Sequence, residues 1–115
     1  MSIFQLHSKA GYPIDASYIQ SCDLEIRNLH VHDLDILIQV NNDFGIFHYS
    51  LHNLSGLNQP GSTLVIPEIY THHAAFSFLL ITNLLTTSTT ALTLFAKNNG
   101  QVIAIFTQNE FIKFE

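Results

Sequence analysis

The most regular hydrophobic pattern in this chain lies at residues 91–106, with the sequence ALTLFAKNNGQVIAIF. Two apolar arms, rich in β-branched and aromatic residues, flank Asn99 and Gly100. An Asn-Gly pair readily takes the positive φ angles of a two-residue type I′ turn, so the pattern predicts a β-hairpin. The cross-strand pairs expected from this turn are Lys97 with Val102, Phe95 with Ala104, and Thr93 with Phe106.

The second arm of this hairpin, residues 102–106, is apolar at every position. A strand that is apolar on both faces is typical of a central position in a sheet, with cover on each side. We therefore expect Ile103 and Ile105 both to lie in the core.

A second hairpin is indicated by residues 34–40 and 45–52, which are joined by a turn-rich segment at 41–44. In the return arm an apolar set alternates with a set of histidines and a serine. Because successive strand residues point to opposite faces, we expect the histidine set on the face that is more exposed to water. The apolar set is Phe47, Tyr49 and Leu51, and the histidine set is His48, Ser50 and His52.

The beginning of the chain has weaker signals. Residues 2–8 predict a first strand, which Gly11 and Pro13 would end. Residues 15–22 are assigned to one or two helical turns.

Apolar and polar residues alternate from 23 to 32, with an interruption at Asn28. A period of two residues is the mark of a half-buried strand. We therefore predict one strand over residues 23–32 with a β-bulge at Asn28.

Residues 67–84 have the signals of a helix. Proline suits the first helical position, and the following acid, Glu68, would lie near the positive end of the helix dipole. The alternative is a pair of strands, which Phe76, Phe78 and Ile81 and the threonine-rich segment behind them favour. We adopt the helix as the prediction, with Ile69, Phe76, Leu80 and Leu84 on the side that faces the sheet.

Together these elements predict an α+β fold. It consists of an antiparallel sheet of five or six strands, including the two β-hairpins, with one main helix packed on a face. Residues 111–114 would add one more short strand or extend an edge of the sheet. The linker at 53–62, rich in glycine and proline, separates two halves that are each too short to bury a core, so residues 1–115 form a single domain.

The composition is apolar and poor in charge. Hydrophobic residues make up 47% of the chain and charged residues 11%, against roughly 25% charged residues in typical soluble domains. Part of the surface must therefore be covered by uncharged polar side chains or hidden in a partner. Nine acidic and four basic residues give a net charge of −5, which argues against a nucleic-acid partner because four scattered cations make no basic patch.

The sequence also bears on location. A single cysteine, Cys22, excludes an internal disulfide framework and fits a reducing compartment. The N-terminal residues lack the pattern of a signal peptide. The longest apolar tract, residues 74–85, is shorter than the ~18–20 residues of a membrane span. We expect a cytoplasmic protein with no membrane partner.

Histidines are the residues of this chain that could most readily form a metal site. On predicted strands, His30 and His32 would share one face, and His48 and His52 another, so several imidazoles could converge, with Asp33 or Asp35 adding an oxygen ligand. The His-x-His-Asp pattern at residues 30–33 lacks the further ligands that known metal-site motifs place at fixed distances along the sequence. We therefore predict no metal and no cofactor.

Catalytic motifs are also missing. Cys22 stands beside Asp23, whose charge would raise the pKa of the thiol, the opposite of what a reactive thiolate needs. No nucleophile elbow, phosphate-binding loop or dinucleotide fingerprint occurs, and the carboxylates are spread singly. We predict no catalytic residues and no enzyme activity.

Binding is the remaining class of function. The sequence fits a small, acidic, intracellular protein that binds another protein, as a bacterial immunity protein, an inhibitor or a secretion chaperone does. The alternatives are a ligand- or metal-binding domain that uses the histidine-rich face, or a self-associating structural subunit. For a protein partner, basic if charge steers the association, the predicted contact residues are Asp33, Asp35, Asp43, Phe44, Phe47 and Tyr49.

Overall fold

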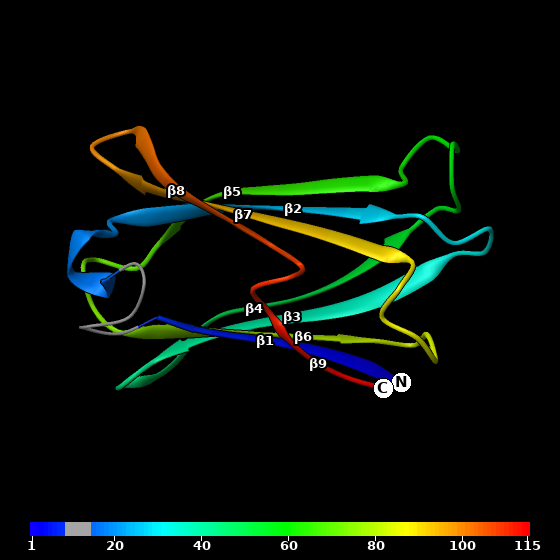
Figure 1. Ribbon diagram of the computed structural model, residues 1–115, viewed down its shortest axis with the longest axis horizontal. Helices are drawn as coiled ribbons and strands as arrows, with labels where there is room; N and C mark the ends of the chain where they lie inside the picture. The colour runs from blue at the N-terminus through cyan, green and yellow to red at the C-terminus, as the bar shows by residue number, and fades with distance from the viewer. Residues whose placement is uncertain (9–14) are drawn as a thin grey trace.

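The described part of the chain folds mainly into β-strands. The computed structural model describes residues 1–8 and 15–115, and Figure 1 shows its strands running in two layers. The first strand, at residues 2–8, is confirmed, while its predicted end at Gly11 and Pro13 lies outside the described residues. The described elements are β1 (Ser2–Ser8), the 3₁₀ helix η1 (Ala16–Tyr18), β2 (Ser21–Asn28), β3 (Leu34–Asn42), β4 (Gly45–Leu54), β5 (Thr63–Tyr70), β6 (Phe76–Thr82), β7 (Thr90–Asn98), β8 (Gln101–Thr107) and β9 (Ile112–Phe114).

The strands form two antiparallel sheets. A five-stranded sheet has the order β4-β3-β6-β1-β9, and a four-stranded sheet has the order β5-β2-β7-β8. The layers lie face to face, with the five-stranded sheet at the bottom of Figure 1 and the four-stranded sheet at the top. This is a β-sandwich, in which the inner faces of both sheets contribute to one core.

The core follows from alternation along the central strands. In β3, Ile36, Ile38 and Val40 are fully buried, while the residues between them are exposed or half-buried. Strands β1, β2, β6 and β7 show the same alternation. Each fully buried aliphatic side chain contributes about 1.5–3 kcal/mol relative to an exposed one, so this layer is the main source of stability.

The predicted helix at residues 67–84 is wrong, and with it the α+β fold class. These residues form the end of β5, a turn and β6. From Phe76 to Thr82 buried and half-buried residues alternate, so the period is two residues rather than 3.6. Among the described residues no helix is long and apolar enough to cross a membrane.

Proline at position 67 has a different role from the one predicted. Strand β5 is an edge of the four-stranded sheet, where a missing N–H costs least. The register between β5 and β2 shifts here, so that Pro67 and Glu68 together face Asp23 in a β-bulge. Glu68 has a φ of 57° at this bulge.

The predicted strand at 23–32 ends early. The side-chain amide of Asn28 donates hydrogen bonds to the carbonyl oxygens of His32 (2.8 Å) and Ser55 (3.0 Å), and its oxygen accepts one from the His30 N–H (3.0 Å). Asn28 therefore ends β2 and holds the following loop, rather than forming a bulge within a strand. The helical turns predicted at 15–22 are reduced to η1, because β2 already begins at Ser21.

Both predicted hairpins are confirmed, as β3–β4 and β7–β8. In the second, Asn99 and Gly100 have φ angles of 53° and 79°, as a type I′ turn requires. The pair Lys97–Val102 is also confirmed. The other two expected pairs are wrong by one residue, because a bulge that adds Ile103 to β8 shifts the register, so that Phe95 faces Ile105 and Thr93 faces Thr107.

Strand β8 is not a central strand. It lies at the edge of the four-stranded sheet, and the exposed fractions of Ile103 and Ile105 are 43% and 55%. The prediction that both are buried is wrong, because an edge strand has a neighbouring strand on one side alone and its side chains are less covered than those of a central strand. Here the sheet ends at this strand.

The turn at Gly100 allows a test of the backbone constraint. Replacing Gly100 with Val should destabilise the protein by about 1–3 kcal/mol, since a β-branched residue is strained at a positive φ. A Cβ at this position would meet no atom within 4 Å, so crowding does not contribute. Gly100→Asn is the control and should cost less, because Asn tolerates the left-handed region. Equal unfolding midpoints in urea for Gly100→Val and wild type would contradict the turn assignment.

A second test compares the core with the edge. Ile38→Ala should lower the free energy of unfolding by about 2–5 kcal/mol, because Ile38 is fully buried between the sheets. Ile105→Ala should stay within about 0.5 kcal/mol of wild type, because Ile105 is more than half exposed on an edge strand. Chemical denaturation of both variants measures the difference, and similar losses would place β8 in the core after all.

Candidate functional site

The residues predicted for partner binding do not form a single patch. Phe47 and Tyr49 lie on β4 and are exposed, whereas Asp43 and Phe44 form the turn at one end of the β3–β4 hairpin, with Phe44 97% exposed. Asp33 and Asp35 lie at the opposite end of β3, roughly 25 Å from the turn at ~3.3 Å per residue. The structure therefore groups the two aromatic residues of β4 but separates the acids.

Tyr49 belongs to a larger apolar surface on the outer side of the five-stranded sheet. Cross-strand partners share a face of a sheet, so the register identifies which side chains lie together. We define the apolar face by the outward side chains Ile3, Leu37, Tyr49, Leu51, Leu79, Ile81, Ile112 and Phe114.

Five of these side chains form one continuous row across the sheet. Leu51 on β4 is opposite Leu37, which is opposite Ile81, then Ile3, and finally Phe114 on β9. The outermost two, Leu51 and Phe114, are 71% and 50% exposed, and the three between them are half-buried by their neighbours. No described segment lies below this sheet in Figure 1.

A second row runs parallel to the first and is mixed. It contains Tyr49, Gln39, Leu79, Gln5 and Ile112 in order across the sheet. The two glutamines are polar but uncharged. The apolar face therefore joins two neighbouring rows without any charge between them.

Sequence reasoning missed most of this face. Its members come from five strands between Ile3 and Phe114, and the register that aligns them is not visible along the chain. One signal was available: Leu79 and Ile81 make β6 apolar on both faces, as a strand with a second apolar contact would be. Because these residues were predicted to be helical, the pattern was not recognised as that of a strand.

Charge is distributed unequally between the two outer faces. The outer face of the four-stranded sheet carries Asp23, Glu25 and Arg27 on β2. On the described strands of the five-stranded sheet, Asp35 at the end of β3 is the sole charged residue on the outer side. The apolar face is thus the uncharged side of a molecule whose charge lies elsewhere.

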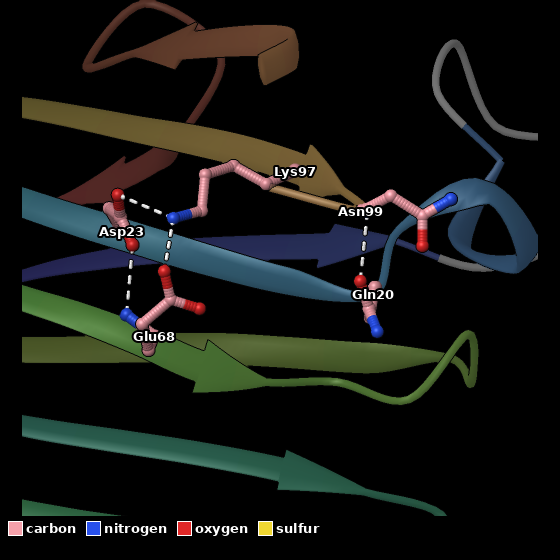
Figure 2. Close-up of polar contacts among 5 residues, drawn as sticks. All are labelled: Gln20, Asp23, Glu68, Lys97 and Asn99. Carbon is pink, nitrogen blue, oxygen red and sulfur yellow. Dashed lines mark hydrogen bonds and ion pairs between the residues drawn. The ribbon is translucent and has the colours of Figure 1, made fainter. Parts of the chain in front are cut away.

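Lys97 is held in an ion-pair network on the four-stranded sheet. Its ammonium lies 3.1 Å from Asp23 Oδ2 and is also paired with Glu68, as Figure 2 shows. The Glu68 N–H donates to Asp23 Oδ1 at 2.8 Å, so the network secures the bulge in β5. The hydrogen bond to Glu68, and then that to Asp23, raises the pKa of Lys97. With two carboxylates on one ammonium, this lysine is unsuited to bind an external anion.

The strand β2 also holds the single thiol. Cys22 is fully buried, and burial followed by the charge of Asp23 raises its pKa to about 12. This confirms the prediction that Asp23 opposes thiolate formation. The residue packs as a small apolar side chain in the core.

The four histidines considered as possible metal ligands occupy two separate places. His48, Ser50 and His52 lie on the inward side of β4, opposite Val40, Ile38 and Ile36, so the prediction that they face water is wrong. Ser50 Oγ is hydrogen-bonded to His48 Nε2 (3.1 Å) and His52 Nε2 (2.8 Å). Burial, and then His52, lowers the pKa of His48.

The other two histidines of this set, His30 and His32, lie in the loop after β2, with ring centroids 5.4 Å apart. In the described part of the chain no group of three or more His, Cys, Asp or Glu side chains is placed to hold a metal ion. The convergence on which the metal-binding alternative depends is therefore not present among these residues.

One small cavity opens near the hairpin turn. It has a volume of about 180 Å³, below the roughly 300–1,000 Å³ of typical small-molecule sites. It is lined by His7, Ser8, Asn41, Asn42, Asp43, Ala75, Phe76 and Ser77. A hydrogen bond from the Ser77 hydroxyl to Asn41 Oδ1 (2.8 Å) uses two of its polar groups within the protein.

Comparison with known proteins adds no relative: no protein-family model, curated protein sequence or solved structure matches this chain.

The buried thiol predicts how stability depends on pH. Because the pKa of Cys22 is about 12 in the folded protein and 9.0 as its ordinary value, the unfolded chain loses the thiol proton first as the pH rises. Stability should therefore fall above pH 9, by up to about 1.4 kcal/mol per pH unit until pH 12. The raised pKa of Lys97 acts in the same direction, through loss of its ion pairs at high pH.

Urea denaturation at a series of pH values would measure this effect. Cys22→Ala should lose less stability between pH 9 and 12 than wild type does, whatever its stability at pH 7. Parallel pH profiles for the two proteins would show that the thiol is not the group responsible.

Proposed function

We propose that this chain is a protein-binding protein without a catalytic centre, and that the apolar face is its contact surface. The observation that carries the proposal is the outward row from Leu51 to Phe114 across all five strands, which no described segment covers (Figure 1). Proteins that stay monomeric rarely expose contiguous apolar patches of more than a few hundred Å².

The size of the face supports this use. Four strand spacings of ~4.8 Å give the row a length of about 19 Å, and the second row lies ~7 Å away. Side chains around these rows give a surface on the order of several hundred Å², against about 800 Å² per partner in a standard interface. The apolar face thus has the size of an interface core, which a polar rim would complete.

The acidic residues at the two ends of the β3–β4 hairpin suggest the chemistry of the partner. Asp33 and Asp35 lie at one end of the β3–β4 hairpin, and Asp43 lies at the other, beside the exposed ring of Phe44. With a net charge of −5, these acids would attract a partner that carries basic residues around an apolar centre. The partner we propose is therefore another protein, basic at its rim.

The carboxylates engaged in hydrogen bonds serve structural roles, which fits a non-catalytic protein. Glu110 accepts hydrogen bonds from the N–H and hydroxyl of Thr107 (2.8 and 2.7 Å), and these lower its pKa. Glu115 accepts from the N–H of Thr87 (3.0 Å), which lowers its pKa as well. An inhibitor, an immunity protein or a secretion chaperone in the cytoplasm would have these properties.

Site-specific photo-crosslinking in the native cell tests the proposal. A benzoylphenylalanine at Leu79, near the middle of the apolar face, should cross-link to a defined protein that mass spectrometry can identify. The matched control is the same residue at Val65, an exposed apolar position on the outer side of the four-stranded sheet. Adding Leu37→Glu to the Leu79 protein should abolish the cross-link without altering its melting temperature.

Two outcomes would contradict the proposal. One is the absence of any cross-link from Leu79, and the other is the same products from Leu79 and Val65. Either would mean that the apolar face has no dedicated protein partner.

A further inference from the structure

The four sheet edges differ in how far they are protected against pairing with another strand. Natural proteins block edges with proline, bulges, charges or very short strands. Strand β5 has Pro67 and the bulge at Glu68, and β9 has only three residues, one of them Lys113. In β8 the bulge at Ile103 interrupts the strand and leaves residues 104–107 in regular register.

Strand β4 lacks comparable protection. It is ten residues long and contains neither proline nor a charged residue. Its bulge lies beside the turn, so residues 48–54 pair with β3 in unbroken register. Among the described residues, β3 is its sole strand partner, and its backbone makes no hydrogen bond to a turn or loop. One side of β4 therefore presents a regular edge to solvent.

The sequence of β4 is suited to pairing with itself. Around Ser50 it reads similarly in both directions, with a large apolar residue at each neighbouring position and a histidine at the next: His48, Tyr49, Ser50, Leu51, His52. If two copies met antiparallel about a two-fold axis at Ser50, each Tyr49 would lie opposite Leu51 of the other copy. Aromatic and aliphatic side chains form favourable cross-strand pairs at such positions.

The charge distribution favours the same partner. Two copies of a chain with net charge −5 repel each other least when they meet along an uncharged surface. Strand β4 supplies one, because an antiparallel pair of residues 48–52 brings no carboxylate opposite another. The exposed fractions of Tyr49 and Leu51, 64% and 71%, show that both side chains are accessible to a second copy.

We infer that this protein forms a homodimer in which β4 of one copy pairs antiparallel with β4 of the other. The two five-stranded sheets would join into one continuous sheet of ten strands, a self-complementary interface of the kind that two-fold symmetry requires. The inference goes beyond the proposed function, since it uses the edge of the sheet. The dimer leaves the outer side open and joins two apolar faces into one surface.

Charge substitutions on β4 test both the interface and its register. Wild-type protein should have a mass of twice 13.0 kDa by light scattering at micromolar concentrations. Tyr49→Lys combined with Leu51→Lys should weaken self-association at least tenfold, because each Lys would oppose a Lys of the other copy. Tyr49→Glu combined with Leu51→Glu should do the same. Mixing the two variants should restore a dimer, since Lys would then oppose Glu.

The control is Val65→Lys on β5, which is also an exposed apolar position on an edge strand and should leave the dimer intact. Circular dichroism and melting temperature establish that each variant is folded. A monomeric wild-type protein, or a dimer that survives the two-lysine change, would overturn the inference. If the two-lysine and two-glutamate variants are folded but stay monomeric when mixed, the proposed register of the β4–β4 pair is wrong. The cross-linking from Leu79 is carried out with Tyr49 and Leu51 unchanged, so the proposed function fails or stands separately from the dimer.

Discussion

The structure depends on one apolar layer between two sheets, which neither sheet can form alone. The chain crosses between the sheets repeatedly: β1, β3, β4, β6 and β9 lie in one sheet, and β2, β5, β7 and β8 lie in the other. The two ends of the chain also meet, because β9 pairs with β1. Each sheet therefore combines strands from before and after the linker at 53–62, which makes the residues on its two sides dependent on each other for burial.

A sandwich uses one face of each sheet, and the composition decides what the other two faces can be. With 11% charged residues, the chain cannot cover both outer faces with charge. The charged side chains of β2, together with Glu68 and Lys97, lie on the four-stranded sheet. The outer side of the five-stranded sheet is left mainly with aliphatic, aromatic and uncharged polar side chains, and with Asp35 at one end. The apolar face is thus a consequence of how a small number of charges is distributed.

Local signals in the sequence predicted those parts of the fold that depend on neighbouring residues. The type I′ turn at Asn99 and Gly100, the β3–β4 hairpin and the short strands at both ends were found, because turn chemistry and alternation are properties of short segments. The helix at 67–84 was wrong because a proline and an acid serve a β-bulge as well as a helix start. The burial of Ile103 and Ile105 was predicted wrongly, because it depends on whether another strand pairs with β8. The local sequence of a strand does not contain that information. The apolar face was missed for the same reason, since it depends on the order of five strands.

The irregular positions of the backbone decide which edge stays open to a partner. Three bulges occur in the described pairings: opposite Asp23 in β5, at Ile103 in β8, and beside the turn in β4. The first two interrupt both edges of the four-stranded sheet, and the pairing of Glu68 with Lys97 holds the first in place. The third lies at the end of its strand and interrupts little. The polar network therefore secures one of the two bulges that protect the four-stranded sheet from adding strands, while the five-stranded sheet retains both a regular edge and an apolar face. An association that used both would concentrate all contacts on the sheet with the least charge, where the cost of removing water from charged groups is lowest.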